Sequence, residues 1–205
     1  MAKNVGIFIF DEVDILDFSG PYEVFCRTRT EPGIKSRNNN SGPFNVFTIS
    51  IREKIIQASG GLKVVADYNF KNAPEVDILL IPGGLGTRQL LESQETISWI
   101  LDIAERTSLL TSVCTGSLLL AQAGLLKNKR ATTHWGALDL LQEISPSTKV
   151  IKDQRVVDDG IVTSAGVSSG IDMAFQVVEE LFGTDVASDT AKYIEYERTT
   201  EIAPI

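Results

Sequence analysis

The sequence predicts an α/β protein with a mainly parallel sheet, because short apolar runs alternate with longer stretches of helical spacing. Each run has the length of one buried strand, and in the longer stretches apolar residues recur every three or four positions. The five predicted strands are VGIFIF at 5–10, FNVFTI at 44–49, DILLIP at 77–82, SLLTSVC at 108–114 and GIVTSAG at 160–166.

Two of the longer stretches predict amphipathic helices that cover the sheet. The first spans residues 90–104. The second spans residues 170–182, with Ser168 or Ser169 at its N-cap and Gly183 where a C-terminal stop is expected.

Two segments between the helices and strands have their own patterns. Residues 30–43 are polar and have the composition of an exposed loop. The segment VIKDQRVVDDGIVTSAG at 150–166 predicts a β-hairpin before a central strand, with turns near 152–154 and 158–160.

We expect one domain over residues 1–205, because a chain of 205 residues with 43% hydrophobic types can bury one substantial core. No internal repeat divides it. After Gly183 the sequence ASDTAKYIEYE predicts a last helix, and we expect its Tyr193 and Tyr196 to dock on this same domain.

Composition excludes several classes of protein. Nineteen basic against 27 acidic residues give a net charge of −8, which argues against nonspecific binding to nucleic acid. No apolar stretch approaches the ~20 residues needed to cross a bilayer. The two cysteines, Cys26 and Cys114, are too few for a disulfide scaffold, and the N-terminal run is soon acidic, unlike a signal peptide. We therefore expect a cytoplasmic protein.

The segment SLLTSVCTGSLLLAQAGLL at 108–126 is the most informative for chemistry. An apolar strand runs into Cys114 and changes at Thr115-Gly116 into a helical pattern, which resembles the nucleophile elbow G-x-S-x-G with cysteine as nucleophile. Backbone N–H groups and the following helix can lower the pKa of such a thiol below its usual ~8.5. The simpler interpretation is a small buried hydrophobic residue, and we interpret Cys26 in that way.

A second candidate feature is IPGGLGTRQLL at 81–91. Gly83 and Gly84 follow a strand, so their backbone N–H groups can point into the crevice where α/β proteins bind ligands and can serve as an oxyanion hole. A plain tight turn is the alternative. The glycine spacing does not match the dinucleotide pattern G-x-G-x-x-G, and there is no P-loop lysine.

The acidic string DEVDILDFSGP supplies a third candidate, Asp17. Asp14 and Asp17 are spaced for one helical face, but Ser19-Gly20-Pro21 has the pattern of a helix start and leaves Asp17 in the preceding loop. A partly desolvated carboxyl beside a thiol would have a raised pKa and would carry protons. Alternatively Asp17 is a helix-end residue that interacts with the dipole. We expect Asp11, Glu12 and Asp14 to face solvent.

The single histidine, His134 in ATTHWGAL, is the one available for any Cys-His catalysis. A lone histidine beside a tryptophan is more often a packed polar residue than a base. With one histidine and no further ligands at metal-binding spacing, we predict no metal site.

Taken together, these motifs resemble the PfpI/ThiJ superfamily, which is glutamine amidotransferase-like. The string CTGS…AGLL…ATTHW resembles one branch, shared by isocyanide hydratases and by the amino-terminal domains of AraC-type regulators. Those regulators carry a further helix-turn-helix domain, which does not follow in this chain, so we expect the enzyme branch. The matching segments are 6–25, 77–88, 112–135 and 164–181.

The resemblance implies a flavodoxin-like three-layer α/β sandwich with Cys114 on the elbow, in a homodimer without metal or organic cofactor. It implies that Cys114 attacks an isocyanide to give a thioimidate, that Asp17 handles the protons, and that water then releases an N-substituted formamide. By the same resemblance Thr115 stabilises the intermediate, Gly83 and Gly84 contribute donors to the substrate pocket, and His134 is not required.

Two other functions are compatible with the same superfamily, because fold alone does not determine reaction. One is a noncatalytic ligand or redox sensor in which Cys114 is oxidised beside Asp17. The other is a glyoxalase-like enzyme that acts on small ketoaldehydes and releases a hydroxy acid.

Overall fold

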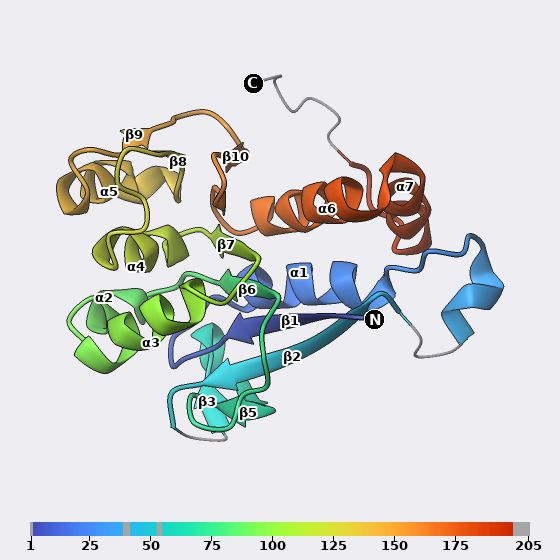
Figure 1. Ribbon diagram of the computed structural model, residues 1–205, viewed down its shortest axis with the longest axis horizontal. Coiled ribbons are helices and arrows are strands. Elements are labelled where there is room, and N and C mark those ends of the chain that lie inside the picture. The colour runs from blue at the N-terminus through green and yellow to red at the C-terminus, as the bar shows by residue number, and fades with distance from the viewer. Residues whose placement is uncertain (1, 39–41, 53–54, 199–205) are drawn as a thin grey trace.

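The computed structural model describes residues 2–38, 42–52 and 55–198. In these residues a seven-stranded sheet lies between two layers of helices (Figure 1). Neighbouring strands are parallel except β10 and β11, which are antiparallel. In spatial order the strands are β10 (Val156–Asp158), β11 (Val162–Ser164), β7 (Leu109–Val113), β6 (Ile78–Ile81), β1 (Lys3–Phe8), β2 (Phe44–Ser50) and β5 (Tyr68–Asn69).

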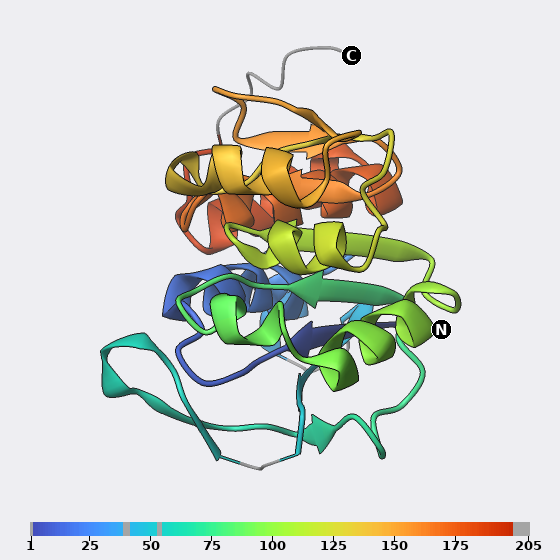
Figure 2. The ribbon, with the colours of Figure 1, turned by 90° about the vertical axis from the view of Figure 1, so that its left-hand side faces the viewer.

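The helices form one layer on each face of the sheet (Figures 1 and 2). Contacts among helices follow the same division, since those of one layer pack on one another. One layer holds α1 (Ile15–Arg27), α6 (Ser169–Phe182) and α7 (Thr184–Tyr193), and the other α2 (Thr87–Leu90), α3 (Gln94–Ala104), α4 (Gly116–Gln122) and α5 (Leu138–Ile144). The predicted three-layer sandwich is confirmed.

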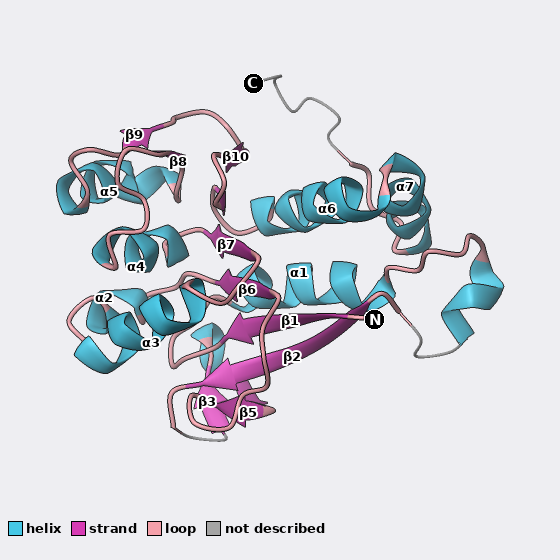
Figure 3. Cartoon of the chain, viewed as in Figure 1, coloured by secondary structure: helices cyan, strands magenta, loops and turns pink. Residues whose placement is uncertain are grey.

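The remaining elements are short and lie in the connections (Figure 3). Two small sheets pair β3 (Ile55–Gln57) with β4 (Lys63–Val65) and β8 (Arg130–Ala131) with β9 (Lys149–Val150). Three turns of 3-10 helix cover Ile34–Asn38, Ser59–Gly61 and Trp135–Ala137. No helix in the described ranges is long and apolar enough to cross a membrane.

All five predicted strands are confirmed within a few residues. Val5, Ile7 and Phe8 of β1 are each fully buried, as are Leu79 and Leu80 of β6. These strands carry continuous apolar runs because helices cover both faces of the sheet. The carboxyl ends of β1, β6, β7 and β11 therefore meet at one edge of a rigid core.

The predicted helix over 90–104 is divided in two. α2 ends at Leu90 and α3 begins at Gln94, with Ser93 between them as a true N-cap whose Oγ accepts the Thr96 N–H at 3.3 Å. The apolar spacing continues across this break, so periodicity alone did not reveal it. The prediction for 170–182 is confirmed by α6, which ends at Gly183 with a φ of 89°.

The predicted hairpin turn at 152–154 is wrong. The amides of Lys149 and Ile151 donate to the carbonyls of Lys129 and Ala131, so β9 pairs with β8 in a separate sheet. The second turn is confirmed, because β10 and β11 form an antiparallel pair on either side of it. β11 pairs with β10 on one side and with β7 on the other, so it lies inside the sheet, as predicted for the strand after the hairpin.

The predicted loop at 30–43 includes residues 39–41, which lie outside the described residues, and its described part is more than an exposed loop. Arg37 is buried, and its guanidinium pairs with Asp189 at 2.6 Å and lies over the Tyr193 ring. Tyr196 stacks on Phe175 and donates its hydroxyl to Asp172. Docking of the two tyrosines is thus confirmed, and α7 ties the earlier segment to the core.

Candidate active site

Three of the predicted site segments converge at the carboxyl edge of the sheet. Cys114 follows β7 directly, Gly83 and Gly84 follow β6, and Asp17 lies in the first turn of the helix that follows β1. β1, β6 and β7 are adjacent parallel strands, so these residues become neighbours although up to 97 positions separate Asp17 from Cys114. This edge is where open α/β sheets bind ligands.

Cys114 has the backbone conformation of a nucleophile elbow. Its φ is 56°, in the left-handed region that is unfavourable for a residue with a side chain. Its N–H donates to the carbonyls of Ser164 and Ala165, both at 3.1 Å, and its own carbonyl accepts the Thr133 hydroxyl at 2.9 Å. These bonds hold the strained turn in one orientation.

Asp17 lies in the first turn of α1, and not in a loop before the helix as predicted. α1 begins at Ile15 and contains Pro21, because packing against α6 outweighs the hydrogen bond that a proline cannot donate. The Asp17 side chain is fully buried, and its Oδ2 accepts the Gly83 N–H at 2.9 Å. No donor in the described part of the chain reaches its Oδ1.

Burial changes the acidity of this carboxyl. Desolvation, opposed by the Gly83 N–H and the Cys114 thiol and assisted by the charge of Asp14, raises the pKa of Asp17 from 3.8 to about 7. The raised pKa that we expected for a desolvated carboxyl beside a thiol is thus present in the structure. At neutral pH this group can both accept and release a proton.

The thiol pKa moves in the direction opposite to our expectation. Burial, followed by the charge of Asp17, raises the pKa of Cys114 to about 12, although the N–H groups of Thr115 and Val167 stabilise the thiolate. Desolvation therefore outweighs the backbone donors of the elbow. At a pH between these two pKa values, Asp17 is ionised and Cys114 keeps its proton, so the pair holds one proton.

The paired glycines place the neighbouring side chains. The Gly83 N–H is bound to Asp17, and the Gly84 N–H donates to Thr115 Oγ1 at 3.0 Å. The Thr87 hydroxyl lies 3.2 Å from the same oxygen and donates to the Gly84 carbonyl. Both amides already have acceptors within the protein, so donation to a substrate stays a prediction that requires these bonds to be exchanged.

Glycine is required at both positions by close approach of other backbone segments. A Cβ on Gly83 would lie 2.5 Å from the Thr115 nitrogen, and one on Gly84 would lie 2.3 Å from the Glu12 carbonyl oxygen. On the elbow itself, a Cβ on Gly116 would lie 2.0 Å from the Ile81 carbonyl oxygen. The site is thus built on backbone contacts that leave no room for side chains.

Two contributors to the site were missed from the sequence. Asp14 is half-buried, and its carboxylate lies within 4.8 Å of the Asp17 carboxylate and of the Cys114 sulfur, whereas we expected it in solvent. Its spacing from Asp17 would have revealed this, had the helix start been placed at Ile15. Val167 donates its N–H to the sulfur, and no sequence pattern marks a backbone donor of this kind.

The imidazole of His134 makes no hydrogen bond with Cys114 in the described part of the chain. Its Nδ1 accepts the Gly136 N–H at 3.2 Å, and its ring lies so close to Gly166 that a Cβ there would be 2.3 Å from Cδ2. This is the packed polar residue that we expected, and a Cys-His arrangement is not formed.

A shared cation is geometrically conceivable between Asp14, Asp17 and Cys114, since one ligand atom from each lies within 4.8 Å of the others. Coordination would require the thiolate and both carboxylates to be ionised together. Burial raises the pKa values of both Asp17 and Cys114, which opposes that state.

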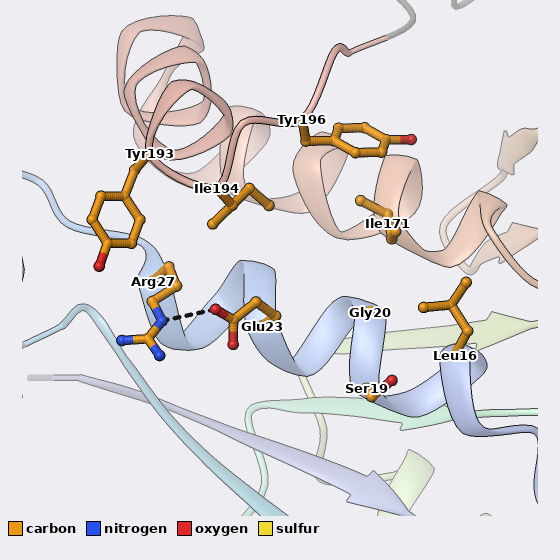
Figure 4. A pocket seen from close by; sticks show the side chains of 9 residues that line it. All are labelled: Leu16, Ser19, Gly20, Glu23, Arg27, Ile171, Tyr193, Ile194 and Tyr196. Carbon is orange, nitrogen blue, oxygen red and sulfur yellow. Dashed lines mark hydrogen bonds and ion pairs between the residues drawn. The ribbon is translucent and has the colours of Figure 1, made fainter.

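A separate surface groove of about 490 Å³ lies between α1, α6 and α7 (Figure 4). Its lining includes Leu16, Glu23 and Arg27 from α1, with Ile171 and Tyr193 opposite them. Neither Asp17 nor Cys114 lines it, because these side chains lie on the buried side of α1 and on the elbow.

Comparison with known proteins matches residues 3–180 to the DJ-1/PfpI family. The chain is 35% identical over 196 residues to an isonitrile hydratase of Pseudomonas putida, in an alignment that covers 96% of this chain and 79% of that protein. It is 26% identical over 198 residues to the HTH-type transcriptional regulator GbdR of Pseudomonas aeruginosa, covering 96% of this chain and 51% of the regulator.

Solved structures agree with the fold described above. A ThiJ/PfpI family protein from Pseudomonas syringae superimposes with a TM-score of 0.83 at 26% identity, covering 99% of this chain and 78% of that one. DJ-1beta of Drosophila melanogaster gives a TM-score of 0.80 at 19% identity, covering 96% of this chain and 100% of that one, which shows a shared fold.

Proposed function

Because this chain belongs to the DJ-1/PfpI family, we propose that it is an enzyme that adds water to an isocyanide and releases an N-substituted formamide. The observation that carries the proposal is the buried pair of Asp17 and Cys114, which holds one proton. Similarity to an isonitrile hydratase over 96% of the chain supports the same reaction. The terminal isocyanide carbon accepts both a nucleophile and a proton, and this pair supplies both.

In the first step, Asp17 takes the thiol proton of Cys114 and delivers it to the terminal carbon, while the sulfur bonds to that same carbon. The carbon–nitrogen triple bond becomes a double bond. The product is a neutral thioimidate, R–N=CH–S–Cys114, and Asp17 is left ionised. No second acid is needed, because the addition consumes the one proton that the pair held.

In the second step, ionised Asp17 takes a proton from a water molecule whose oxygen bonds to the thioimidate carbon. One proton goes to the substrate nitrogen, and the carbon–sulfur bond breaks with its electron pair on sulfur. Asp17 passes the proton that it took from water to this sulfur, so the pair again holds one proton, on Cys114. The overall change is R–NC plus H₂O to R–NH–CHO, with the enzyme regenerated.

The surrounding groups fit this scheme. The N–H groups of Thr115 and Val167 stabilise negative charge on sulfur as it leaves, and the Thr115 hydroxyl is held by Gly84 and Thr87 beside them. Gly83 holds Asp17 toward the same space. No residue of the scheme calls for a metal or organic cofactor.

A redox sensor is less well supported by this geometry. Peroxide reacts with thiolates, and the raised pKa of Cys114 leaves little thiolate at neutral pH. A glyoxalase-like reaction uses the same thiol but yields a hydroxy acid. One relative, 26% identical over 139 residues, is a glutathione-independent glyoxalase of Caenorhabditis elegans, so the assay includes methylglyoxal.

The test is incubation of the purified protein with cyclohexyl isocyanide, with formamide followed by proton NMR. We expect turnover by the wild type and by Cys26→Ser, and none by Cys114→Ser. Cys26 is the matched control, since it is the other free cysteine and lies in α1 away from the site. Formamide production by Cys114→Ser would overturn the covalent mechanism, and turnover of methylglyoxal alone would favour the glyoxalase.

We further propose a homodimer, as the resemblance to the superfamily implies. The chain has a mass of 22.4 kDa, so light scattering during gel filtration would give about twice that value for a dimer. A mass equal to that of one chain at working concentrations would contradict it.

A further inference from the structure

Asp14 stands at the N-cap of α1 but does not cap the helix. Its backbone is extended, with φ of −70° and ψ of 127°, and its side chain accepts no hydrogen bond from the first turn. An aspartate at this position ordinarily accepts an N–H from the second or third helical residue. Here its carboxylate instead lies within 4.8 Å of the Asp17 carboxylate and the Cys114 sulfur.

The backbone fixes Asp14 in this place. Its N–H donates to the Gly83 carbonyl at 3.0 Å, and the preceding residue, Val13, forms a β-bridge with Gly84. Asp14 takes part in none of the ion pairs formed by the described residues. Its charge is therefore not neutralised by a cation held next to it.

The titratable groups that face Asp17 come from two elements. Asp14 approaches from the start of α1 and Cys114 from the elbow after β7, while the loop after β6 contributes only the Gly83 N–H. The carboxylates of Asp14 and Asp17 face Cys114, together with the N–H groups of Thr115 and Val167. Among the described residues, Asp14 is thus a charge outside the reacting pair that acts on both Asp17 and Cys114.

We propose that Asp14 is a positioning residue whose negative charge holds protons on the Asp17–Cys114 pair and thereby sets the lower pH limit at which the pair can react. The pair reacts when it holds one proton, because a doubly protonated pair has no group to accept the thiol proton. A like charge nearby makes loss of the first proton harder. Removing that charge therefore extends reactivity to lower pH.

This inference rests on the proposed function, but its test does not require isocyanide turnover. The rate at which iodoacetamide alkylates Cys114 is measured from pH 5 to pH 9 in a Cys26→Ser background. In the wild type we expect the plot of alkylation rate against pH to have an inflection near neutral pH. In Asp14→Asn this inflection should lie about 0.5–1 pH unit lower, because that is the effect of one unit charge at this distance in a partly solvated site. Well below the inflection, alkylation would be ~3–10-fold faster.

Two further variants separate charge from structure. Glu12→Gln removes an equal charge from an exposed neighbour and should leave the inflection in place, and Asp14→Glu should stay close to the wild type because it keeps the charge. A purely structural role for Asp14 would lower the rate at every pH without moving the inflection. That result, or an unchanged profile, would overturn the inference.

The outcome is distinguishable from failure of the proposed function. If no formamide forms but the inflection is shifted in Asp14→Asn, the isocyanide reaction is contradicted and the role of Asp14 in this site is supported. If formamide forms but the inflection is unshifted in Asp14→Asn, only the role of Asp14 is contradicted.

Discussion

The amide of Gly83 donates a hydrogen bond of 2.9 Å to Oδ2 of Asp17, across 66 positions of sequence. The bond joins the loop after β6 to the first turn of α1 and aims the carboxyl at the elbow after β7. It also favours the ionised carboxylate, in opposition to burial, so that the pKa of Asp17 comes to about 7. The acid of the site is thus tuned by two opposing effects.

Replacement of this acid should separate turnover from thiol reactivity. In Asp17→Asn we expect formamide production to fall ~10²–10⁴-fold, since the group that carries the proton is lost. Because the charge of Asp17 raises the pKa of Cys114, alkylation of the thiol by iodoacetamide at pH 10, where hydroxide and not Asp17 removes the thiol proton, should become faster. A variant that lost both activities together would point to a displaced elbow instead of a missing acid.

The buried carboxyl should also make folding stability depend on pH. The pKa of Asp17 is raised from 3.8 to about 7 in the folded protein, so its contribution to stability is present below about pH 4 and is lost as pH rises through 7. The shift corresponds to about 4 kcal/mol at 1.36 kcal/mol per pH unit. The free energy of unfolding, measured with urea, should therefore fall more between pH 4 and pH 8 in the wild type than in Asp17→Asn. Equal losses would mean that the carboxyl is not desolvated.

The Thr115 hydroxyl should matter for both stability and rate. Thr115→Val removes the acceptor of the Gly84 N–H and leaves that buried donor without a partner, at a cost of about 1–3 kcal/mol in the free energy of unfolding. Turnover should fall as the loop loses its link to the elbow. Thr115→Ser keeps the hydroxyl and serves as the control, in thermal melts and in the formamide assay. A stability loss in Thr115→Ser equal to that in Thr115→Val would show that the methyl group, and not the hydrogen bond, is what matters.

Much of the fold was predictable because its signals are local. Most residues of the five predicted strands are buried, and α6 carries an apolar stripe that is followed by Gly183. The elbow was predictable for the same reason, since a strand, a cysteine and a small residue are consecutive in the sequence.

The parts that were missed depend on contacts between distant segments. The start of α1 was misplaced because Pro21 normally marks a first turn, whereas packing on α6 accommodates it in the interior of the helix. The direction of the Cys114 pKa was missed because desolvation depends on how completely the neighbouring layers cover the sulfur. Pairing of β9 with β8 was likewise decided by a segment some 20 residues earlier.

The close backbone contacts at Gly83, Gly84 and Gly116 bear on how this site can diverge in evolution. Any side chain at these positions would collide with backbone at 2.5 Å or less, so mutation is tolerated least where the acid and the nucleophile are held. Leu85, one residue further along the same loop, is 67% exposed and has no such constraint. New substrate preferences would therefore arise through unconstrained side chains such as that of Leu85, while the positions of Asp17 and Cys114 are inherited unchanged.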